Sequence, residues 1–340
     1  MKKKELSAVI AAVLAASMLF CGCSSPADPD ASETPAADER LEYELDYHKA
    51  SDLLKDAVGE KTVTEACKIV DAFLAHEETV TLDLSGLPNG YPDMLGYAAS
   101  MMCPLFSAFE IYNSNTDIDE STGVLTFRYA ADKDKINDCR TLLETCVQQM
   151  MGKLRSGDTQ TMRALLLYNG LTHGSYYDYD LPSDVEFDDT DYLLRTSSYS
   201  ALVQGSGICS SYSQSLAFLF TLADIDAGTV DCFEGIAHTW VLAKLDGKYY
   251  YFDPTWDAGG SLLYFGMTAA DRATEWGGGY PEDLCTMSSI VASEKYDITD
   301  TRFAPLRDYG INVSEPVEAD RANCAVKVTA EGEEFIIDCK

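Results

Sequence analysis

Cys209, His238 and Asp253 are the residues of this 340-residue chain whose types and order best fit a chemical function. A thiol, an imidazole and a carboxylate in a hydrogen-bonded line form a catalytic unit that attacks carbonyl groups. The thiolate is the nucleophile, the imidazole is the base, and the carboxylate orients the ring. The local sequence around each residue must place the three side chains together.

Cys209 is predicted to lie at the start of a helix. It follows the small residues of segment 205–207, and apolar residues between Tyr212 and Ala223 then recur at helical spacing. The first turn of a helix presents unpaired backbone N–H groups and the positive end of the macrodipole, which stabilise a thiolate. Cys209 is therefore the candidate nucleophile.

The base can be chosen from few candidates, because the chain has 4 histidines. His238 begins a run, 238–245, that reads as a β-strand, and Asp-Gly at 246–247 is typical of a two-residue hairpin turn. With that turn, His238 lies opposite Thr255 and Asp253 is its diagonal neighbour, within about 7–8 Å at the backbone. We expect a hydrogen bond between the two side chains.

Each of these residues alone has an ordinary explanation. A single Cys is usually a small buried hydrophobic residue, and a single His is usually a satisfied structural residue. Their combination on a helix start, a strand and the returning strand favours a catalytic triad over coincidence. The competing interpretation is a protein that keeps the fold without the activity.

Three short blocks of the sequence resemble the signature of a known superfamily. These blocks are Gly-x-Cys-x-x-Tyr at 207–212, Ala-His-Thr-Trp-Val at 237–241 and Phe-Asp-Pro-Thr-Trp-Asp at 252–257. They are similar to the signature blocks of the transglutaminase-like superfamily, which is related to papain-like proteases. The resemblance covers 155–287 and implies an α+β fold, in which a helix carrying the Cys packs on an antiparallel sheet carrying the His and Asp. One departure is Ser210-Ser211, where many bacterial members have Gln-Gly.

The triad and the resemblance together predict a cysteine acyl-transfer enzyme that acts on peptide or carboxamide carbonyls and needs no cofactor and no metal. With water as acceptor it is a peptidase or amidase, which the resemblance to bacterial members favours. With an amine as acceptor it is a protein-glutamine transglutaminase. A surface binding module with an inactive cleft is the third alternative.

Four further residues are candidates for the pocket around the triad. The Cys209 backbone N–H and one upstream group would hold the oxyanion, and Gln204 and Tyr199 are the candidates for that group. Trp240 and Trp256 are expected to wall the site, although core packing would give the same pattern in the sequence.

The N-terminus predicts export. Lys2 to Lys4 precede a short apolar run, 8–20, which fits a signal peptide at 1–22 and is too short for a permanent membrane span. The following residues, Leu-Phe-Cys-Gly-Cys at 19–23, resemble a bacterial lipobox, which implies lipidation of Cys23 and an anchor on the extracellular side of the membrane. Residues 23–40 contain little that could enter a core, and we expect a disordered tether.

The rest of the chain divides into three predicted regions: an N-terminal α+β accessory lobe at 41–154, the catalytic domain at 155–290 and a β-rich region at 291–340. In the lobe we expect helices at 65–76, 92–102 and 136–154, and strands at 79–84, 106–112 and 124–130.

The formal net charge of −31 makes nucleic acid an improbable partner, because the chain repels polyanions. The acidic segment 115–121 has EF-hand-like spacing, but Glu120 replaces the turn Gly, so we interpret it as a hairpin loop. The acidic segment 178–191 reads as a solvated loop, and no Cys-x-x-Cys supports zinc. The expected partners are a protein or peptide substrate and, through the anchor, the membrane.

The 11 cysteines include one pair that the register can assign. Glu-Gly at 331–332 is expected to be the turn of a hairpin in which Cys324 and Cys339 face each other, so the two thiols are a disulfide candidate under oxidising conditions.

Overall fold

The computed structural model describes residues 39–113, 117–181, 189–232, 237–274, 289–309 and 313–340. The predicted signal peptide, Cys23 and nearly all of the predicted tether lie outside these residues, so the export predictions stay predictions. Among the helices of the described residues, none is long and apolar enough to cross a membrane.

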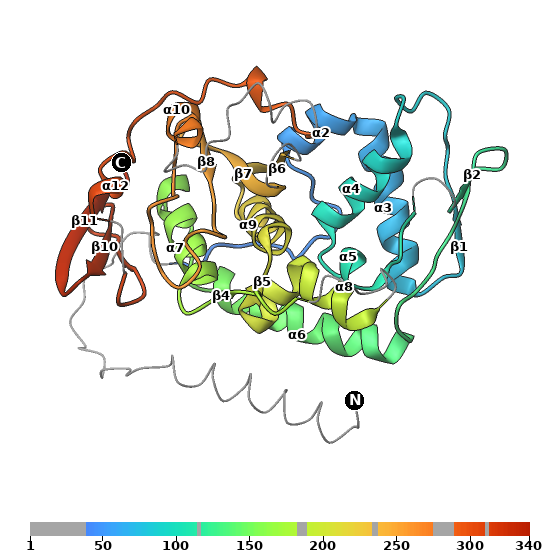
Figure 1. The fold of residues 1–340 in the computed structure, drawn as a ribbon, viewed down its shortest axis with the longest axis horizontal. Helices are drawn as coiled ribbons and strands as arrows, with labels where there is room; N and C mark the ends of the chain where they lie inside the picture. The colour runs from blue at the N-terminus through green and yellow to red at the C-terminus, as the bar shows by residue number, and fades with distance from the viewer. Residues whose placement is uncertain (1–38, 114–116, 182–188, 233–236, 275–288, 310–312) are drawn as a thin grey trace.

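A three-stranded antiparallel sheet of order β6-β7-β8 forms the centre of the molecule (Figure 1). It comprises β6 (Asp226–Cys232), β7 (His238–Leu245) and β8 (Lys248–Phe252). Leu245 pairs with Lys248, which confirms the predicted register of the hairpin. Asp246 and Gly247 have φ values of 50° and 84°, the left-handed conformation that a two-residue turn of this kind requires.

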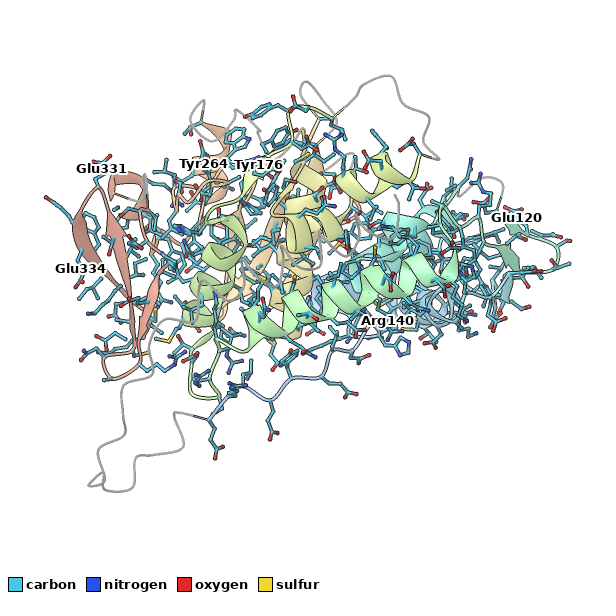
Figure 2. The ribbon with its side chains drawn as sticks, turned by 90° about the horizontal axis from the view of Figure 1, so that it is seen from below. Glu120, Arg140, Tyr176, Tyr264, Glu331 and Glu334 are labelled. Atoms are coloured by element: carbon cyan, nitrogen blue, oxygen red, sulfur yellow. The ribbon has the colours of Figure 1, made fainter. Side chains whose placement is uncertain are left out.

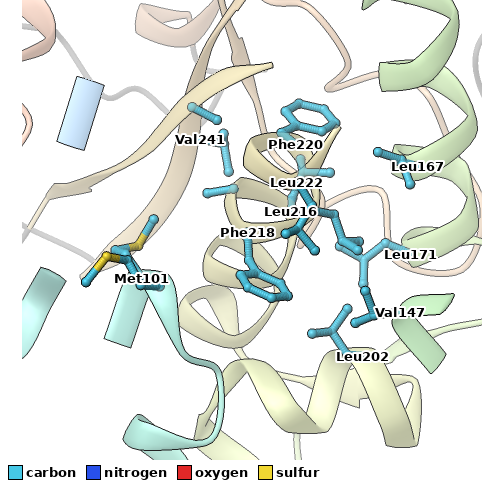
Figure 3. Close-up of a cluster of buried hydrophobic side chains, with 14 of the residues drawn as sticks. Met101, Val147, Leu167, Leu171, Leu202, Leu216, Phe218, Phe220, Leu222 and Val241 are labelled. Carbon is cyan, nitrogen blue, oxygen red and sulfur yellow. The ribbon is translucent and has the colours of Figure 1, made fainter. Parts of the chain in front are cut away.

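Helix α9 (Cys209–Leu222) packs against one face of this sheet and lies at the centre of the core. Figure 3 shows its side chains Leu216, Phe218, Phe220 and Leu222 among residues of the surrounding helices and the sheet. Because Leu216 and Phe220 are fully buried, the position of the helix is set by packing along its whole length. This helix therefore holds its first residue, Cys209, in a defined place.

The opposite face of the sheet is also covered. Trp240 and Leu242, which alternate along β7 with Val241 and Ala243, belong to a second apolar cluster that includes Leu53 of α2 (Asp52–Val58). Coverage on both faces explains why four successive residues of β7, 240–243, are apolar rather than alternating with polar residues.

The N-terminal region surrounds this centre mainly with helices. Its remaining elements are α3 (Glu60–Ala75), α4 (Tyr91–Met102), α5 (Phe106–Phe109) and α6 (Lys133–Met151), with a small sheet of order β1-β3-β2 made of β1 (Thr79–Thr81), β2 (Ile118–Asp119) and β3 (Val124–Thr126). The predicted helices at 65–76, 92–102 and 136–154 correspond to α3, α4 and α6. Both predicted strands, 79–84 and 124–130, are shorter than expected.

The predicted strand at 106–112 is wrong, because α5 occupies its first half. Glu110 N–H donates to the Phe106 carbonyl at 2.8 Å, and Phe106 and Phe109 are both buried. Alternating apolar residues favoured a strand, but an apolar segment this short fits the period of a helix as well as that of a strand. Burial of both phenylalanines on one side decides for the helix. Only Glu110 retains a β-bridge, to Tyr129.

The middle of the chain carries the elements that flank α9. These are α7 (Gln160–Thr172), β4 (Tyr176–Tyr177), α8 (Thr190–Thr196), a π-helical turn (Ser200–Gln204), β5 (Ser206–Gly207) and α10 (Ala269–Ala273). Helices combined with three separate antiparallel sheets and the short parallel pair β4-β5, within the described residues, make the fold α+β.

The C-terminal region contains the strands β9 (Glu318–Asp320), β10 (Ala325–Ala330) and β11 (Glu333–Asp338), with short helices at Ser293–Lys295 and Leu306–Tyr309. In β10 and β11, Ala325 pairs with Asp338, and the Cys339 N–H donates to the Cys324 carbonyl at 2.9 Å. The hairpin register is thus the predicted one. Both thiols are free in the structure, and the disulfide stays a prediction.

Candidate active site

Cys209 is the first residue of α9 and is half-buried. The preceding strand β5 pairs in parallel with β4, with Gly207 beside Tyr177, and this pairing fixes the chain just before the helix. Gly207 is needed for its size, because a Cβ atom there would lie 2.6 Å from the Ser211 Cβ. The thiol therefore sits where a tightly packed strand turns into the N-terminus of a buried helix, next to the partial positive charge of its first turn.

The two serines that follow Cys209 hold this helix start in place. Ser210 Oγ donates to the Thr196 carbonyl at 3.2 Å, and Ser211 Oγ donates to the Arg195 carbonyl at 3.3 Å. Ser211 Oγ also accepts the Ile208 N–H at 3.2 Å, which satisfies one of the backbone donors at the helix start. Ser210 and Ser211 thus connect the start of α9 to the C-terminal end of α8.

His238 begins β7 and is 7% exposed. Its Nε2 lies 2.7 Å from Asp253 Oδ2, and the ring also hydrogen-bonds the Cys209 side chain. Since Asp253 occupies Nε2, the other ring nitrogen, Nδ1, is the one available to the thiol. Burial acts to lower the pKa of His238, but the negative charge of Asp253 and the hydrogen bonds to Asp253 and Cys209 outweigh it and raise this pKa to about 9.

Asp253 follows β8 directly and is fully buried. Its Oδ1 accepts the backbone N–H groups of Thr255 and Trp256, at 3.2 and 3.4 Å. Burial acts to raise the pKa of Asp253, but the charges of His238 and Arg272 and their hydrogen bonds lower it to about 2. The carboxylate is therefore ionised at neutral pH, and it can stabilise an imidazolium.

Arg272, a residue that the sequence analysis missed, completes the surroundings of this carboxylate. It comes from α10, is 1% exposed, and its Nη1 donates to Asp253 Oδ2 at 2.8 Å. Its guanidinium lies 4.2 Å from the ring centroid of Trp240 and 5.1 Å from that of Trp256. A single Arg in a short polar segment carries no signal that links it to a distant Asp, so only the tertiary structure could reveal it.

The rings of Trp240 and Trp256 both lie near that of His238. The ring centroid of His238 is 6.1 Å from that of Trp240 and 5.4 Å from that of Trp256. Trp240 is buried, whereas Trp256 is 36% exposed. Of the two residues, Trp256 is therefore the one that can contact a substrate, and Trp240 packs behind the site.

Tyrosines near Cys209 extend this aromatic surface. Tyr177 lies close enough to Cys209 for the two side chains to interact electrostatically, and burial together with this interaction raises the pKa of Tyr177. Tyr176 is 61% exposed, and Tyr264 packs edge-on against Trp256 at 5.0 Å. In the view of Figure 2, Tyr176 and Tyr264 project from the same edge of the molecule.

The two oxyanion candidates have different surroundings. Gln204, at the end of the π-helical turn, is exposed and stays a candidate. The Tyr199 hydroxyl instead hydrogen-bonds the Cys139 thiol of α6. Tyr199 was expected to bind the oxyanion, but its side chain is turned into the core, where the residue is 4% exposed and has Cys139 as its partner.

A buried network supports the loop after Asp253. The Tyr168 hydroxyl of α7 contacts the Asp253 carbonyl oxygen at 3.0 Å and Asp257 Oδ2 at 2.5 Å. Asp257 also accepts the Leu263 and Tyr264 N–H groups, at 3.1 and 2.9 Å. Burial raises the pKa of Asp257 to about 7. This network connects α7 to the residues that carry Asp253 and Trp256, and the sequence analysis did not identify it.

Comparison with known proteins shows little. No protein-family model matches the chain, and no curated protein matches it. A solved structure described as the crystal structure of a TGase is similar over 37% of this chain and 34% of its own, with 15% sequence identity and a TM-score of 0.29. A likeness of this extent carries no argument, so the interpretation of the site rests on its own geometry.

Proposed function

We propose that this protein is a cysteine acyl-transfer enzyme in which Cys209 is the nucleophile, His238 is the general base and acid, and Asp253 orients the imidazole. The observation that carries the proposal is the line of contacts from the Cys209 thiol through the His238 ring to the ionised, buried Asp253. Each member comes from a separate element, and such a line is the arrangement that nucleophilic catalysis requires.

The chemistry follows from this arrangement. The raised pKa of His238 favours its protonated form, so the thiol proton rests on the imidazole and the thiolate attacks a carbonyl carbon to form a tetrahedral oxyanion. The Cys209 backbone N–H in the first turn of α9 is the proposed donor for this oxygen, with Gln204 as a further candidate. The imidazolium then protonates the leaving amine, which leaves a thioester on Cys209. Attack by water, assisted by His238, releases the acid and restores the thiol.

The favoured activity is that of a peptidase or amidase, with a protein or peptide substrate in contact with Trp256. Incubation of the chain with a glutamine-containing peptide and a fluorescent primary amine tests whether water or an amine accepts the acyl group. Peptide cleavage or ammonia release without amine incorporation supports hydrolysis. Stable incorporation of the amine would instead identify a transglutaminase.

A cysteine-directed electrophile that carries a peptide recognition element tests the nucleophile itself. We expect selective labelling at Cys209, identified by peptide mapping, and no labelling in the Cys209→Ala variant. Cys67→Ala is the matched control, because Cys67 is also half-buried but burial raises the pKa of its thiol. Equal labelling of Cys67 and Cys209, with no turnover of any substrate, would support the inactive binding module.

The proposed location is the extracellular side of a membrane, through a lipid on Cys23. This part of the proposal rests on the sequence of residues 1–23 alone. Membrane association that disappears in the Cys23→Ser variant supports it, and a wild-type protein released with an unmodified N-terminus would contradict it.

A further inference from the structure

A cavity of about 700 Å³ lies apart from the triad, between the N-terminal helices and the helix that carries Cys209. It is lined from α4, from α5 and the residues after it, from α8 by Leu193, from α9 by Gln214, and by Arg128, which follows β3. Figure 1 shows these four helices converging near the centre of the molecule. Its volume is in the range of sites that bind small molecules, about 300–1,000 Å³.

Glu110 contributes a buried carboxyl group to the lining of this cavity. Its side chain is 4% exposed, and its Oε1 accepts the Arg128 N–H at 2.9 Å. Within the described residues, its Oε2 has no hydrogen-bond partner. Burial, and after it the charge of Asp117, raises the pKa of Glu110 to about 7, although the Arg128 N–H acts against this. A buried carboxyl group with one unsatisfied oxygen is costly to retain unless something binds it.

The guanidinium of Arg128, whose backbone N–H binds Glu110 Oε1, has other partners than Glu110 Oε2. The Arg128 guanidinium pairs with Asp117 Oδ2 at 3.0 Å and donates to the Ile111 carbonyl. Glu65, the other buried glutamate of this region, is a useful contrast: Lys68 lies 2.8 Å from both of its oxygens, and the Asp83 N–H lies 2.9 Å from Oε2. Glu65 is fully satisfied by the protein, whereas Glu110 is not.

Two aromatic residues and a second carboxylate of the lining suit an organic cation, and the positive charge of Arg128 is neutralised by its pair with Asp117. Tyr97 and Tyr112 contribute aromatic surface, and the exposed Asp93 adds a negative charge. Tyr112 is held by a hydrogen bond from its hydroxyl to the Pro92 carbonyl at 2.6 Å, and a Cβ on Gly96 would lie 2.5 Å from its ring. A carboxylate together with aromatic rings is the combination that recognises alkylammonium groups in water.

We propose that this cavity binds the ammonium group of a lysine-like side chain, with Glu110 as its counter-ion and Tyr97 and Tyr112 as its aromatic walls. The net charge of −31 attracts such cations to the protein. Gln214 places the site against the helix that begins with Cys209. Binding at this site does not require the acyl-transfer activity proposed above.

The test is calorimetric titration of n-butylammonium into the full chain at pH 8, with n-butanol as the uncharged probe of the same length. The Cys209→Ala variant serves as the background, so that no acyl transfer to the amine contributes heat. We expect saturable binding of n-butylammonium, unchanged by loss of the thiol, and no comparable binding of n-butanol.

The variants distinguish a counter-ion from an apolar pocket. Glu110→Gln keeps the size of the side chain and should weaken binding by about tenfold or more, because the ammonium group loses its charge partner. Glu65→Gln is the matched control and should leave the affinity unchanged. Absence of saturable binding, equal binding of n-butanol, or equal affinity in Glu110→Gln would each overturn the proposal. Loss of labelling at Cys209 would bear on the proposed enzyme and not on this site.

Discussion

Asp253 is a buried carboxylate that receives four hydrogen bonds, two from side chains and two from backbone N–H groups. His238 and Arg272 keep the carboxylate ionised, and the backbone donors hold it in place. Its negative charge can therefore stabilise the protonated imidazole of His238.

Replacement of Asp253 by Asn should therefore reduce kcat by orders of magnitude while the chain still folds. The amide keeps the volume but loses the charge that stabilises the imidazolium, and it leaves Arg272 without its anionic partner. Steady-state kinetics with circular dichroism checks both parts. Asp226→Asn is the control, since Asp226 accepts the Leu53 N–H at 2.8 Å at the start of β6, the end of this strand opposite to the one that pairs with His238. A fully active Asp253→Asn variant would contradict the assigned role.

The pKa of His238 links the site to stability. Because this pKa rises from 6.5 to about 9 on folding, protonation of His238 stabilises the folded state fully below pH 6.5, and this contribution is lost as pH rises towards 9. Urea unfolding of the wild type and of His238→Gln at several pH values measures it. We expect the difference in unfolding free energy to decrease between pH 6.5 and 9, and an increase would contradict the ion-pair interpretation.

At the scale of elements, the junction of β5 and α9 has the least tolerance for change. Gly207 packs against Ser211 and Ser200 at distances that leave no room for a methyl group. Gly207 is not in a left-handed conformation, so its requirement is space and not backbone freedom.

We expect Gly207→Ala to destabilise the fold by about 1–3 kcal/mol through overpacking. It should also lower kcat, because the start of α9 carries Cys209 and must shift to admit the Cβ atom. Gly170→Ala within α7 is the control, since its Cβ would meet Met150 Cε at 3.4 Å and Lys153 Nζ at 4.0 Å, both ends of flexible side chains. Chemical unfolding and kinetics measure both variants, and a Gly207→Ala variant as stable and active as Gly170→Ala would show that crowding at this junction has no cost.

At the scale of the whole molecule, one apolar cluster extends from Tyr47 to Cys339 and joins the three regions predicted from the sequence. The N-terminal helices, α9 and the C-terminal strands all contribute buried side chains to it. Loss of the C-terminal hairpin should therefore weaken more than the hairpin itself, because the hairpin covers part of the shared core.

Oxidation of Cys324 and Cys339 to a disulfide should stabilise the protein by about 3 kcal/mol in the chain-entropy model for a loop of this size. The register places the two residues opposite each other, and both thiols are free in the structure. Thermal unfolding before and after oxidation, with Cys339→Ser as the control, measures the gain. Peptide mapping that finds free thiols at both positions after oxidation would contradict the predicted disulfide.

The sequence by itself determined the local features of the site. The start of α9, the strand β7, the Asp246-Gly247 turn and the register of both hairpins were predictable, because each depends on periodicity or turn chemistry within a short segment. The order of Cys209, His238 and Asp253 indicated a triad for the same reason, since two of its members share one hairpin. The α+β class followed from the same elements.

Only the tertiary structure decided which distant side chains meet. Arg272 behind Asp253, Tyr168 between Asp253 and Asp257, and the unsatisfied oxygen of Glu110 depend on packing between elements far apart in the chain. The strand expected at 106–112 became the helix α5 for the same reason: both periods fit so short a segment, and burial against the rest of the core chose between them. Non-local packing leaves no periodic pattern in a single sequence, so these residues became visible only in the folded chain.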